Sequence, residues 1–539
     1  MKCKMKHVGF AGTVTLFKLF LRRDRLLLPL WVFLPSALGM VVAFTFTAMA
    51  DQGMDSVLRE FHHDPLVSAI LGPVMSFDLS GAIVWRGCSQ MALVLAIGSL
   101  FTMIRHTRTD EETGRSELIR AYVVGPYATL TAALLLTVIG NLVSGMMIAC
   151  SVIALGGETT GSFIFGATMS VVGCFFAGIG ALGVQLRENS GNARGIGIAL
   201  AGLGISMMIL NNVMGGDSVL KWISPMAWQR MTRPFAGNHV WPLIFFILIT
   251  VVPVILSYVL TTRRDLGAGV LPSHPGPAEA SPKFSTPMAL AWRLHKKSFF
   301  GWMICLVLYI VVFSALSPGL AQSGGISGWL SSLGSTNWTE EAGLGYVFIS
   351  IAIYLASIVV AAYAITAMLC IKKEECQGRA ELIVDKRVSR IHWMSGHLFL
   401  AAACSASLLL AMGMAGGLVY GLMTGELRDG FWNILNMNVT KIPPVWILLG
   451  FTALQYGFWP RITSLSWVLW LAFILLELGW EAQLVNWTLL HISPFTFAHY
   501  TINIAKLPLA PLFCLICISG FLAGAGLLGF KRRDVLTNA

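Results

Sequence analysis

Charged residues are scarce in this sequence. Asp, Glu, Lys and Arg together make up 12% of its 539 residues, whereas a soluble globular domain carries about a quarter. So few charges could not cover the surface of a soluble body of this length. Hydrophobic residues make up 56% of the chain, and the mean hydropathy is +0.74. The composition therefore excludes a soluble protein and predicts a polytopic membrane protein.

Motifs for nucleotide binding and for hydrolysis are missing as well. The sequence contains no G-x-x-x-x-G-K-[ST] loop, which would cradle phosphates, and no Gly-Lys dipeptide anywhere. No H-E-x-x-H motif, G-x-S-x-G motif or catalytic carboxylate pair stands in a suitable context. We therefore expect no catalytic residue, metal site or cofactor in this chain. If the function of this protein consumes ATP, a separate subunit must bind ATP and Mg²⁺.

Long apolar runs are what the sequence has in place of charge. A run of about 20 apolar residues can cross the hydrocarbon core of a bilayer, about 30 Å thick. Because lipid offers no partner to backbone N–H and C=O groups, each run must be a helix. Pro443, Pro444 and Pro460 interrupt the tenth and eleventh runs. The twelve predicted spans are 27–48, 87–104, 128–155, 163–185, 195–214, 241–262, 299–319, 345–370, 397–423, 436–458, 464–482 and 508–530.

The positions of the basic residues predict the orientation of the chain. With the N-terminus in the cytoplasm, 29 of the 37 Lys and Arg residues fall in inner segments, while the 26 acidic residues divide equally. The inner face then carries +16 and the outer face −5, which accounts for the net charge of +11. We expect both termini in the cytoplasm. The basic balance is a topology signal and gives no reason to expect a nucleic-acid partner.

A short segment before the first span has its own pattern. Phe10, Val14, Phe17 and Leu21 recur at helical spacing opposite polar and basic residues. This pattern predicts an amphipathic helix on the inner leaflet, and an ordinary basic flank is the alternative.

Short segments of the first half recur in the second half, in the same order and at offsets of 264 or 269 residues. Six spans return the chain to its starting side, so the copies share one orientation and should be related by a pseudo-two-fold axis along the membrane normal. A Pro-rich stretch separates the copies. We divide the chain into a first half (1–265), a cytoplasmic linker (266–287) and a second half (288–539). The matching segments are 110–119 with 374–383, 223–225 with 492–494, and 263–265 with 532–534.

The duplicated loop after the second span of each half has the pattern [DE]-E-x-x-G-R-[SA]-E-L-I. Its residues can form a short charged helix, with the glycine relieving the turn. A cytoplasmic helix of mixed charge suits a soluble partner that docks by complementary electrostatics, and a merely solvated loop is the alternative. The predicted docking residues are Glu111, Glu112, Gly114, Arg115 and Glu117 in the first copy, and Glu375, Gly378, Arg379 and Glu381 in the second.

This loop, the Ile-Ser-Pro element before each sixth span and the Arg-Arg-Asp endings resemble those of ABC-2 type permeases. More narrowly, they resemble the double-length permeases of the tetronasin-resistance (polyketide antibiotic exporter) group, over essentially the whole chain. The resemblance implies an exporter that pairs with two ATP-binding cassette subunits. It further implies that the loops are coupling helices, that the N-terminal segment is the connecting helix, and that Ser224, Pro225, Ser493 and Pro494 belong to outer re-entrant elements.

The two loops are not identical. Glu112 and Thr113 become Cys376 and Gln377 in the second copy, so the two docking sites are expected to differ in strength.

Intramembrane polar residues often mark a substrate pathway, and an interfacial position without a role is the alternative. The weak candidates are Asn211 and Asn212, near the outer end of the fifth span, and Glu477, at the outer end of the eleventh, where we expect water to reach it.

Together these features predict an all-α membrane protein of two parallel six-helix repeats, the permease subunit of an ATP-driven exporter in a bacterial cell membrane. The expected cargo is small and hydrophobic or amphiphilic, such as an antibiotic or drug, and the expected surroundings are lipid. The alternative is a secondary transporter of the major facilitator type. Its G-x-x-x-D-[RK]-x-G-[RK] loop is incomplete here, since the leading glycine and the first basic residue are missing. A membrane enzyme would need a polar catalytic cluster, and the sequence shows none.

Overall fold

The fold is known from a computed structural model of the chain. It describes residues 9–48, 53–63, 67–68, 71–216, 218–265, 267–271, 286–323, 344–384, 388–481, 485–498 and 509–533. Most of the predicted linker 266–287 lies outside these residues, as does Asp534 of the second Arg-Arg-Asp ending. The chain divides into two compact units, Met1–Gly276 and Pro277–Ala539. Helices make up the regular structure of both units, and the described residues contain no strand.

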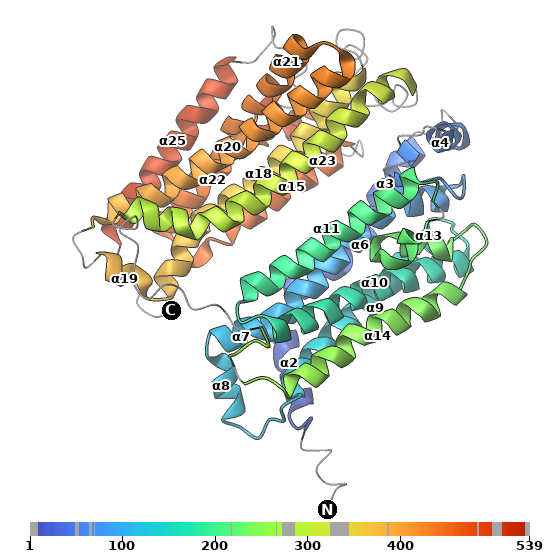
Figure 1. The fold of residues 1–539 in the computed structure, drawn as a ribbon, viewed down its shortest axis with the longest axis horizontal. Helices are drawn as coiled ribbons and strands as arrows, with labels where there is room; N and C mark the ends of the chain where they lie inside the picture. The colour runs from blue at the N-terminus through green and yellow to red at the C-terminus, as the bar shows by residue number, and fades with distance from the viewer. Residues whose placement is uncertain are drawn as a thin grey trace, which may run out of the picture. The chain divides into compact units, whose positions relative to one another are not determined.

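Unit 1 is a bundle of long helices with short helices at its two ends (Figure 1). The short helices α7 and α8 lie at one end, and α4 and α13 lie at the other. Its elements are α2 (Thr13–Arg23), α3 (Leu27–Ala48), α4 (Met54–His63), α6 (Leu79–His106), α7 (Arg108–Glu112), α8 (Arg115–Arg120), α9 (Ala128–Ala154), α10 (Thr159–Leu186), α11 (Ser190–Val213), α12 (Leu220–Ile223), the 3-10 helix η2 (Pro225–Ala227), α13 (Trp228–Thr232) and α14 (Trp241–Thr261).

Unit 2 repeats this plan with differences in detail. Its first helix runs unbroken for 37 residues, where unit 1 has the separate helices α2 and α3. Its elements are α15 (Pro287–Ser323), α18 (Leu344–Cys376), α19 (Arg379–Val384), α20 (Arg390–Thr424), α21 (Leu427–Val439), α22 (Ile442–Phe458), η4 (Pro460–Ile462), α23 (Leu465–Glu481), α24 (Trp487–Leu490), η5 (Pro494–Ala498) and α25 (Leu509–Arg532).

The described residues contain eleven helices that are long and apolar enough to cross a bilayer, not the twelve predicted. The predicted span 464–482 is α23, whose 17 residues are too few for that criterion. The predicted span 436–458 is part of a longer run, Leu427–Phe458, that turns at Thr440 and Lys441. Pro443 follows this turn because a proline, which has no N–H to donate, fits the first turn of a helix.

Polar caps set several helix ends that hydropathy alone misplaces. The second span begins at Leu79 rather than at residue 87, because the Asp78 side chain accepts a hydrogen bond from the Gly81 N–H at 2.8 Å. A side-chain oxygen at this position satisfies a backbone donor that the first turn leaves free. Asn189 caps α11 in the same way, and Ser389 caps α20.

One helix lies at the centre of each unit. In unit 1, α10 packs against α6, α9, α11, α13 and α14, and in unit 2, α18 packs against α15, α20, α22 and α23. About two thirds of the apolar stretch of α10 is buried, against about a fifth in the peripheral α14. Small residues permit this packing: a Cβ atom built at Gly145 of α9 would lie 2.3 Å from the Gly166 carbonyl oxygen of α10. Close backbone approach at small residues is a usual way for membrane helices to pack.

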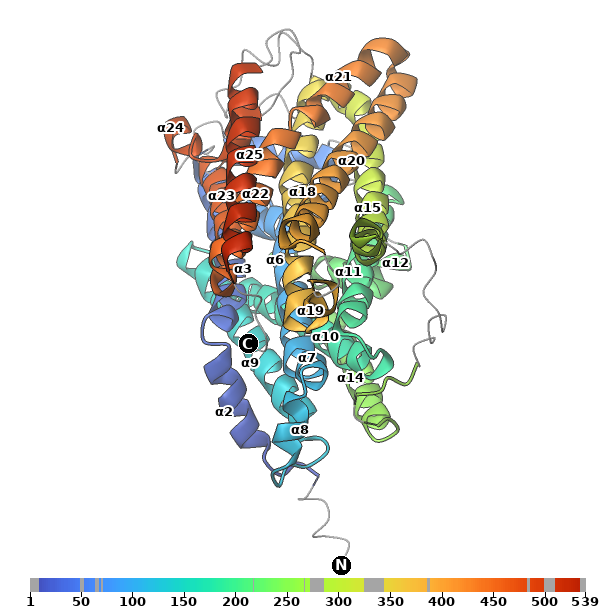
Figure 2. The same ribbon diagram turned by 90° about the vertical axis from the view of Figure 1, so that its left-hand side faces the viewer.

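The predicted amphipathic helix is present as α2, and it lies beside α9 (Figure 2). Leu16 and Phe20 are buried in a cluster with apolar residues of α9. Val14 and Leu21, from the stripe that the sequence singles out, remain exposed. The helix therefore carries two apolar faces, one packed on the bundle and one open to its surroundings.

A bulky residue at the α9–α10 contact should disrupt unit 1. We expect Gly166→Val to destabilise the protein by about 1–3 kcal/mol, because overpacking forces helices apart. The matched control is Gly202→Val, at an exposed position where a Cβ atom meets nothing within 4 Å. Thermal unfolding of the purified protein measures both. Equal stability of the two variants would contradict the packing argument.

Candidate functional site

The duplicated loop folds in the same way in both units. In unit 1 the chain leaves α7, turns at Gly114 and enters α8; in unit 2 it leaves α18, turns at Gly378 and enters α19. The two glycines have φ angles of 72° and 71°. This left-handed conformation is readily adopted only by glycine, which explains why the motif holds a glycine here. The repeated sequence motif therefore specifies the same backbone turn in both units.

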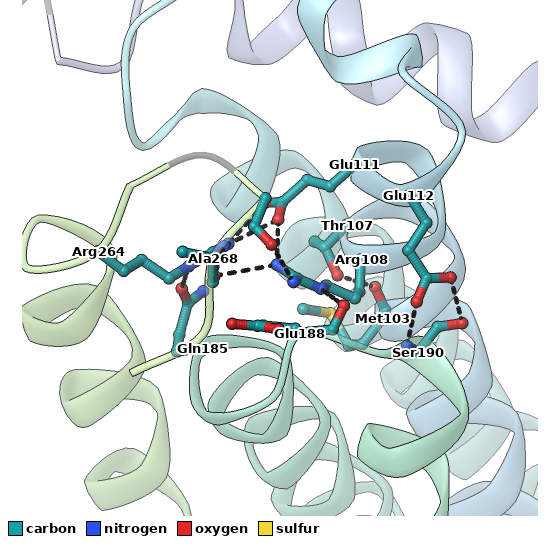
Figure 3. A network of polar contacts seen from close by, with 11 residues as sticks. Met103, Thr107, Arg108, Glu111, Glu112, Gln185, Glu188, Ser190, Arg264 and Ala268 are labelled. Carbon is teal, nitrogen blue, oxygen red and sulfur yellow. Dashed lines mark hydrogen bonds and ion pairs between the residues drawn. The ribbon is translucent and has the colours of Figure 1, made fainter. Parts of the chain in front are cut away.

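Glu111, the second acidic residue of the motif in unit 1, points into the protein (Figure 3). Both carboxylate oxygens of Glu111 accept hydrogen bonds from the Arg264 guanidinium, at 2.6 and 2.8 Å. Arg108 donates a third bond to Glu111 at 2.6 Å. The side chains of Glu111 and Arg264 are only 9% and 7% exposed. A bidentate pair with little access to water ties the loop firmly to the end of α14.

Unit 2 contains the same pair in the same geometry. Arg533 donates to the two carboxylate oxygens of Glu375 at 2.9 and 2.8 Å. The Tyr456 hydroxyl also donates to Glu375, at 2.6 Å, and the Arg533 guanidinium lies 4.8 Å from the centre of the Tyr456 ring. Glu375 corresponds to Glu111 in the duplication, and Arg533 belongs to the second Arg-Arg-Asp ending. The structure thus joins two motifs that the sequence presents as separate.

A second acid–arginine pair spans the glycine turn of each loop. Glu374 accepts from Arg379 at 2.6 and 2.7 Å, and this hydrogen bonding raises the pKa of the Arg379 guanidinium. In unit 1, Asp110 lies 3.8 Å from Arg115 and also accepts from Arg23 of α2 at 2.7 Å. In both units an ion pair therefore joins the residues on either side of the turn. In unit 1 a second ion pair joins the turn to α2.

The loops differ where their sequences differ. Glu112 accepts from the backbone N–H and the hydroxyl of Ser190, at 2.5 and 2.6 Å, and so binds the first turn of α11 (Figure 3). A carboxylate at the N-terminus of a helix also interacts favourably with the helix dipole. The counterpart in unit 2 is Cys376, which is exposed. The first loop consequently holds the fifth span of its half by a contact that a cysteine cannot supply.

A basic residue at the start of each loop makes contacts that the sequence analysis did not predict. Arg108 donates to the Glu188 carbonyl at 2.7 Å and to the Gly267 carbonyl at 2.6 Å. Its counterpart Lys372 donates to the Thr463 hydroxyl at 2.8 Å, in the connection between α22 and α23. Arg108 and Lys372 are 264 residues apart, which is also the offset between the two loop motifs. This shared offset could have revealed them.

Other motif residues face outward. Glu117 and Arg115 are exposed on α8, together with Leu118, and the apolar residues Tyr122 and Val123 follow at its end. In unit 2, Arg379 and Glu381 are exposed on α19. Each loop therefore has an inner face of paired charges and an outer face that is open to contact.

The Ile-Ser-Pro elements form breaks between short helices. The chain passes from α12 through Ser224 into η2, which begins at Pro225, and from α24 through Ser493 into η5, which begins at Pro494. The Ser224 hydroxyl donates to the Gly204 carbonyl of α11 at 2.6 Å. Both serines and both prolines are buried. The elements are thus packed against their bundles.

The candidate pathway residues form hydrogen bonds within their own units. Asn211 accepts from the Ser218 hydroxyl at 2.8 Å and donates to the Gly216 carbonyl at 3.2 Å. Asn212 accepts a hydrogen bond from Arg230. Glu477 is 3% exposed and accepts from the Tyr354 hydroxyl at 2.6 Å. The prediction that water reaches Glu477 was wrong, because α23 turns that side chain towards the core of unit 2.

These features define a class: a polytopic, all-helical membrane protein built from two similar units. Comparison with known proteins makes the assignment specific. The family model "Multidrug efflux system permease Rv1217c, C-terminal domain" matches residues 284–531. The multidrug efflux system permease protein Rv1217c of Mycobacterium tuberculosis is 33% identical over 535 residues, which cover 98% of this chain and 96% of that protein. The chain belongs to the family of multidrug efflux permeases that Rv1217c represents.

The Glu375–Arg533 pair should behave as a buried unit. We expect Glu375→Gln or Arg533→Gln alone to cost about 3–5 kcal/mol, because each leaves one buried charge uncompensated. The double variant should cost less than the sum, and thermal unfolding of all four proteins measures the coupling. The control Glu117→Gln, at an exposed position, should change stability by less than about 0.5 kcal/mol. Additive losses would show that the pair is not coupled.

Proposed function

We propose that this protein is the membrane-spanning permease subunit of an ATP-driven exporter of the ABC-2 type, and that one chain supplies both membrane halves. The observation that carries the proposal is the duplicated loop, in which a buried carboxylate is clamped to the end of the last helix of its unit. Such a clamp lets a push on the loop move that helix. The likeness to a multidrug efflux permease over nearly the whole chain supports export as the direction.

The partners are two ATP-binding cassette subunits, which bind ATP and Mg²⁺. The outer faces of α8 and α19 offer mixed charge for docking, and α8 adds the exposed apolar side chains of Leu118, Tyr122 and Val123. A rim of charge around apolar groups is the composition of many protein interfaces. The inner faces, with Glu111 and Glu375, do not touch the partner in this mechanism. They position the loops.

Transport then follows from the contacts. ATP binding closes the two cassettes and displaces α8 and α19. The Glu111–Arg264 and Glu375–Arg533 pairs pass this movement to α14 and α25, and Glu112 passes it to α11. The resulting change in the two halves moves a small hydrophobic or amphiphilic cargo outward. The name of the M. tuberculosis relative supports drugs as this class of cargo.

A secondary transporter of the major facilitator type fits the contacts less well. The loop lacks the leading glycine of that family's motif and the basic residue that follows the aspartate. Its acidic residues are paired within their own units, so they are poor candidates for carrying protons across the membrane. A membrane enzyme is disfavoured by the sequence, which shows no polar catalytic cluster.

Reversing charge on the outer faces should uncouple the pump without unfolding it. We expect the double variant Glu117→Lys with Glu381→Lys to lose co-purification with the cassette subunits and drug-stimulated ATPase activity by at least tenfold. Both residues are exposed, so thermal stability should stay unchanged. The control carries two reversals on the exposed residues Glu426→Lys and Asp429→Lys, in and beside α21. Undiminished coupling in the first variant would contradict the docking role of the loops.

The orientation gives a second test. If α23 crosses the membrane despite its short length, the chain has twelve spans and both termini in the cytoplasm. A fluorescent protein that folds only in the cytoplasm should then fluoresce when it is fused after Ala539. A periplasmic phosphatase fused at the same position should be inactive. The opposite pattern would mean eleven spans and a C-terminus outside the cell.

A further inference from the structure

The short helix α2 has an exposed basic face. Leu16 and Phe20 point to the bundle and are buried against α9. At the helical spacing of 3.6 residues per turn, Lys18 and Arg22 lie on the opposite side of the helix, and both are exposed. Arg25, in the turn that follows α2, is exposed as well. We call these three cations the basic face of α2.

The fold does not supply this face with a counter-charge. Among the described residues, none of its three cations forms an ion pair with a carboxylate. Residues 9–30 contain one acidic residue, Asp24. Its carboxylate is buried, where Arg105 and His106 hold it. The neighbouring Arg23 already pairs with Asp110 at 2.7 Å. Three positive charges are therefore left for an anion from outside the chain.

Exposed apolar side chains accompany these charges. Val14 and Leu21 lie on the same side of α2 and are 68% and 44% exposed. Leu26 and Leu27 follow Arg25 at the entry to the first span, and they are 77% and 51% exposed. Cations beside exposed apolar groups are typical of a surface that meets the boundary between lipid headgroups and acyl chains.

The basic face lies where the chain enters the bilayer. The first helix that is long and apolar enough to cross a membrane, α3, begins at Leu27, two residues after Arg25. A headgroup layer of about 5–8 Å flanks the hydrocarbon core on each side. The ring of Phe20 stacks on His106 with 4.3 Å between the ring centres, which helps to hold α2 at this end of the bundle (Figure 2). The three cations are thereby kept in or beside the headgroup layer.

We infer that the basic face of α2 is a binding site for the headgroup phosphate of an anionic membrane lipid. The cations attract the phosphate, and Val14 and Leu21 contact the acyl chains. A zwitterionic headgroup carries its own positive charge and binds weakly. An amphipathic helix needs only apolar contact with a bilayer, whereas this site selects between lipids. Its placement at the inner leaflet rests on the predicted orientation of the chain, but its affinity for an anionic headgroup does not.

Binding is measured on the permease alone, in detergent and without any cassette subunit. Dioctanoylphosphatidylglycerol is titrated into the protein, and dioctanoylphosphatidylcholine is the zwitterionic comparison. Amide hydrogen exchange of residues 13–25 reports occupancy, because a bound lipid stabilises the helix against local opening. We expect phosphatidylglycerol to slow this exchange saturably and phosphatidylcholine to leave it unchanged. Raising NaCl to about 0.5 M should weaken the binding, since salt screens exposed charges.

Removing the three cations should remove the site. Each Lys or Arg near an anionic lipid surface contributes about fivefold in affinity. The variant Lys18→Gln with Arg22→Gln and Arg25→Gln should therefore raise the midpoint of the phosphatidylglycerol titration about a hundredfold. All three side chains are exposed, so the fold should stay intact.

A matched control removes three exposed cations from other segments that the orientation places inside, and it should bind the lipid as the wild type does. Its substitutions are Arg187→Gln, Arg263→Gln and Arg461→Gln. Wild-type affinity in the α2 variant would overturn the proposal, and so would equal binding of the two lipids.

An acidic surface of a cassette subunit is the other candidate occupant of the basic face. In that case the α2 variant would lose co-purification with the cassette subunits while its lipid titration stayed unchanged, and the lipid site would be refuted. A failure of lipid binding leaves the coupling role of the loops untouched, because no cassette subunit takes part in the titration.

Discussion

A buried bidentate pair between a loop carboxylate and an arginine at the end of the last helix is the contact on which the arrangement of each unit depends. It occurs as Glu111–Arg264 and as Glu375–Arg533, with nearly the same distances. Because either charge alone would be left uncompensated in a poorly hydrated place, loop and helix are held as one body. The glycine turn then aims the short helix away from the bundle, so the loop can serve both as an anchor inside and as a contact outside.

Around this shared contact the two units have diverged. Unit 1 adds Arg23–Asp110, which ties α2 to the loop, and Glu112–Ser190, which ties the loop to α11. Unit 2 has Cys376 in place of Glu112 and a continuous α15 in place of a separate amphipathic helix. A movement of the first loop is therefore transmitted to more helices than a movement of the second.

Much of the fold could be predicted from the sequence because the bilayer restricts the choice. Eleven of the twelve apolar runs appear as long helices, since only a helix satisfies its own backbone in lipid. Errors arose where local polar contacts matter more than hydropathy. Asp78 starts α6 well before the apolar run, and Glu477 is buried against Tyr354 instead of facing water. Hydropathy averages over many residues, so it cannot detect a single cap or the direction of one side chain.

The sequence by itself determined the class of protein, the approximate spans, and the existence of a duplicated loop with an acidic and basic motif. It could not tell which charges of that motif face inward, and it grouped Glu111 with Glu117. Only the tertiary structure separated them: Glu111 meets Arg264, 153 residues away in the chain, whereas Glu117 remains exposed. The reason is physical. A charge turns inward only where folding brings a counter-charge to it, and that meeting depends on the packing of distant helices, which no local pattern records.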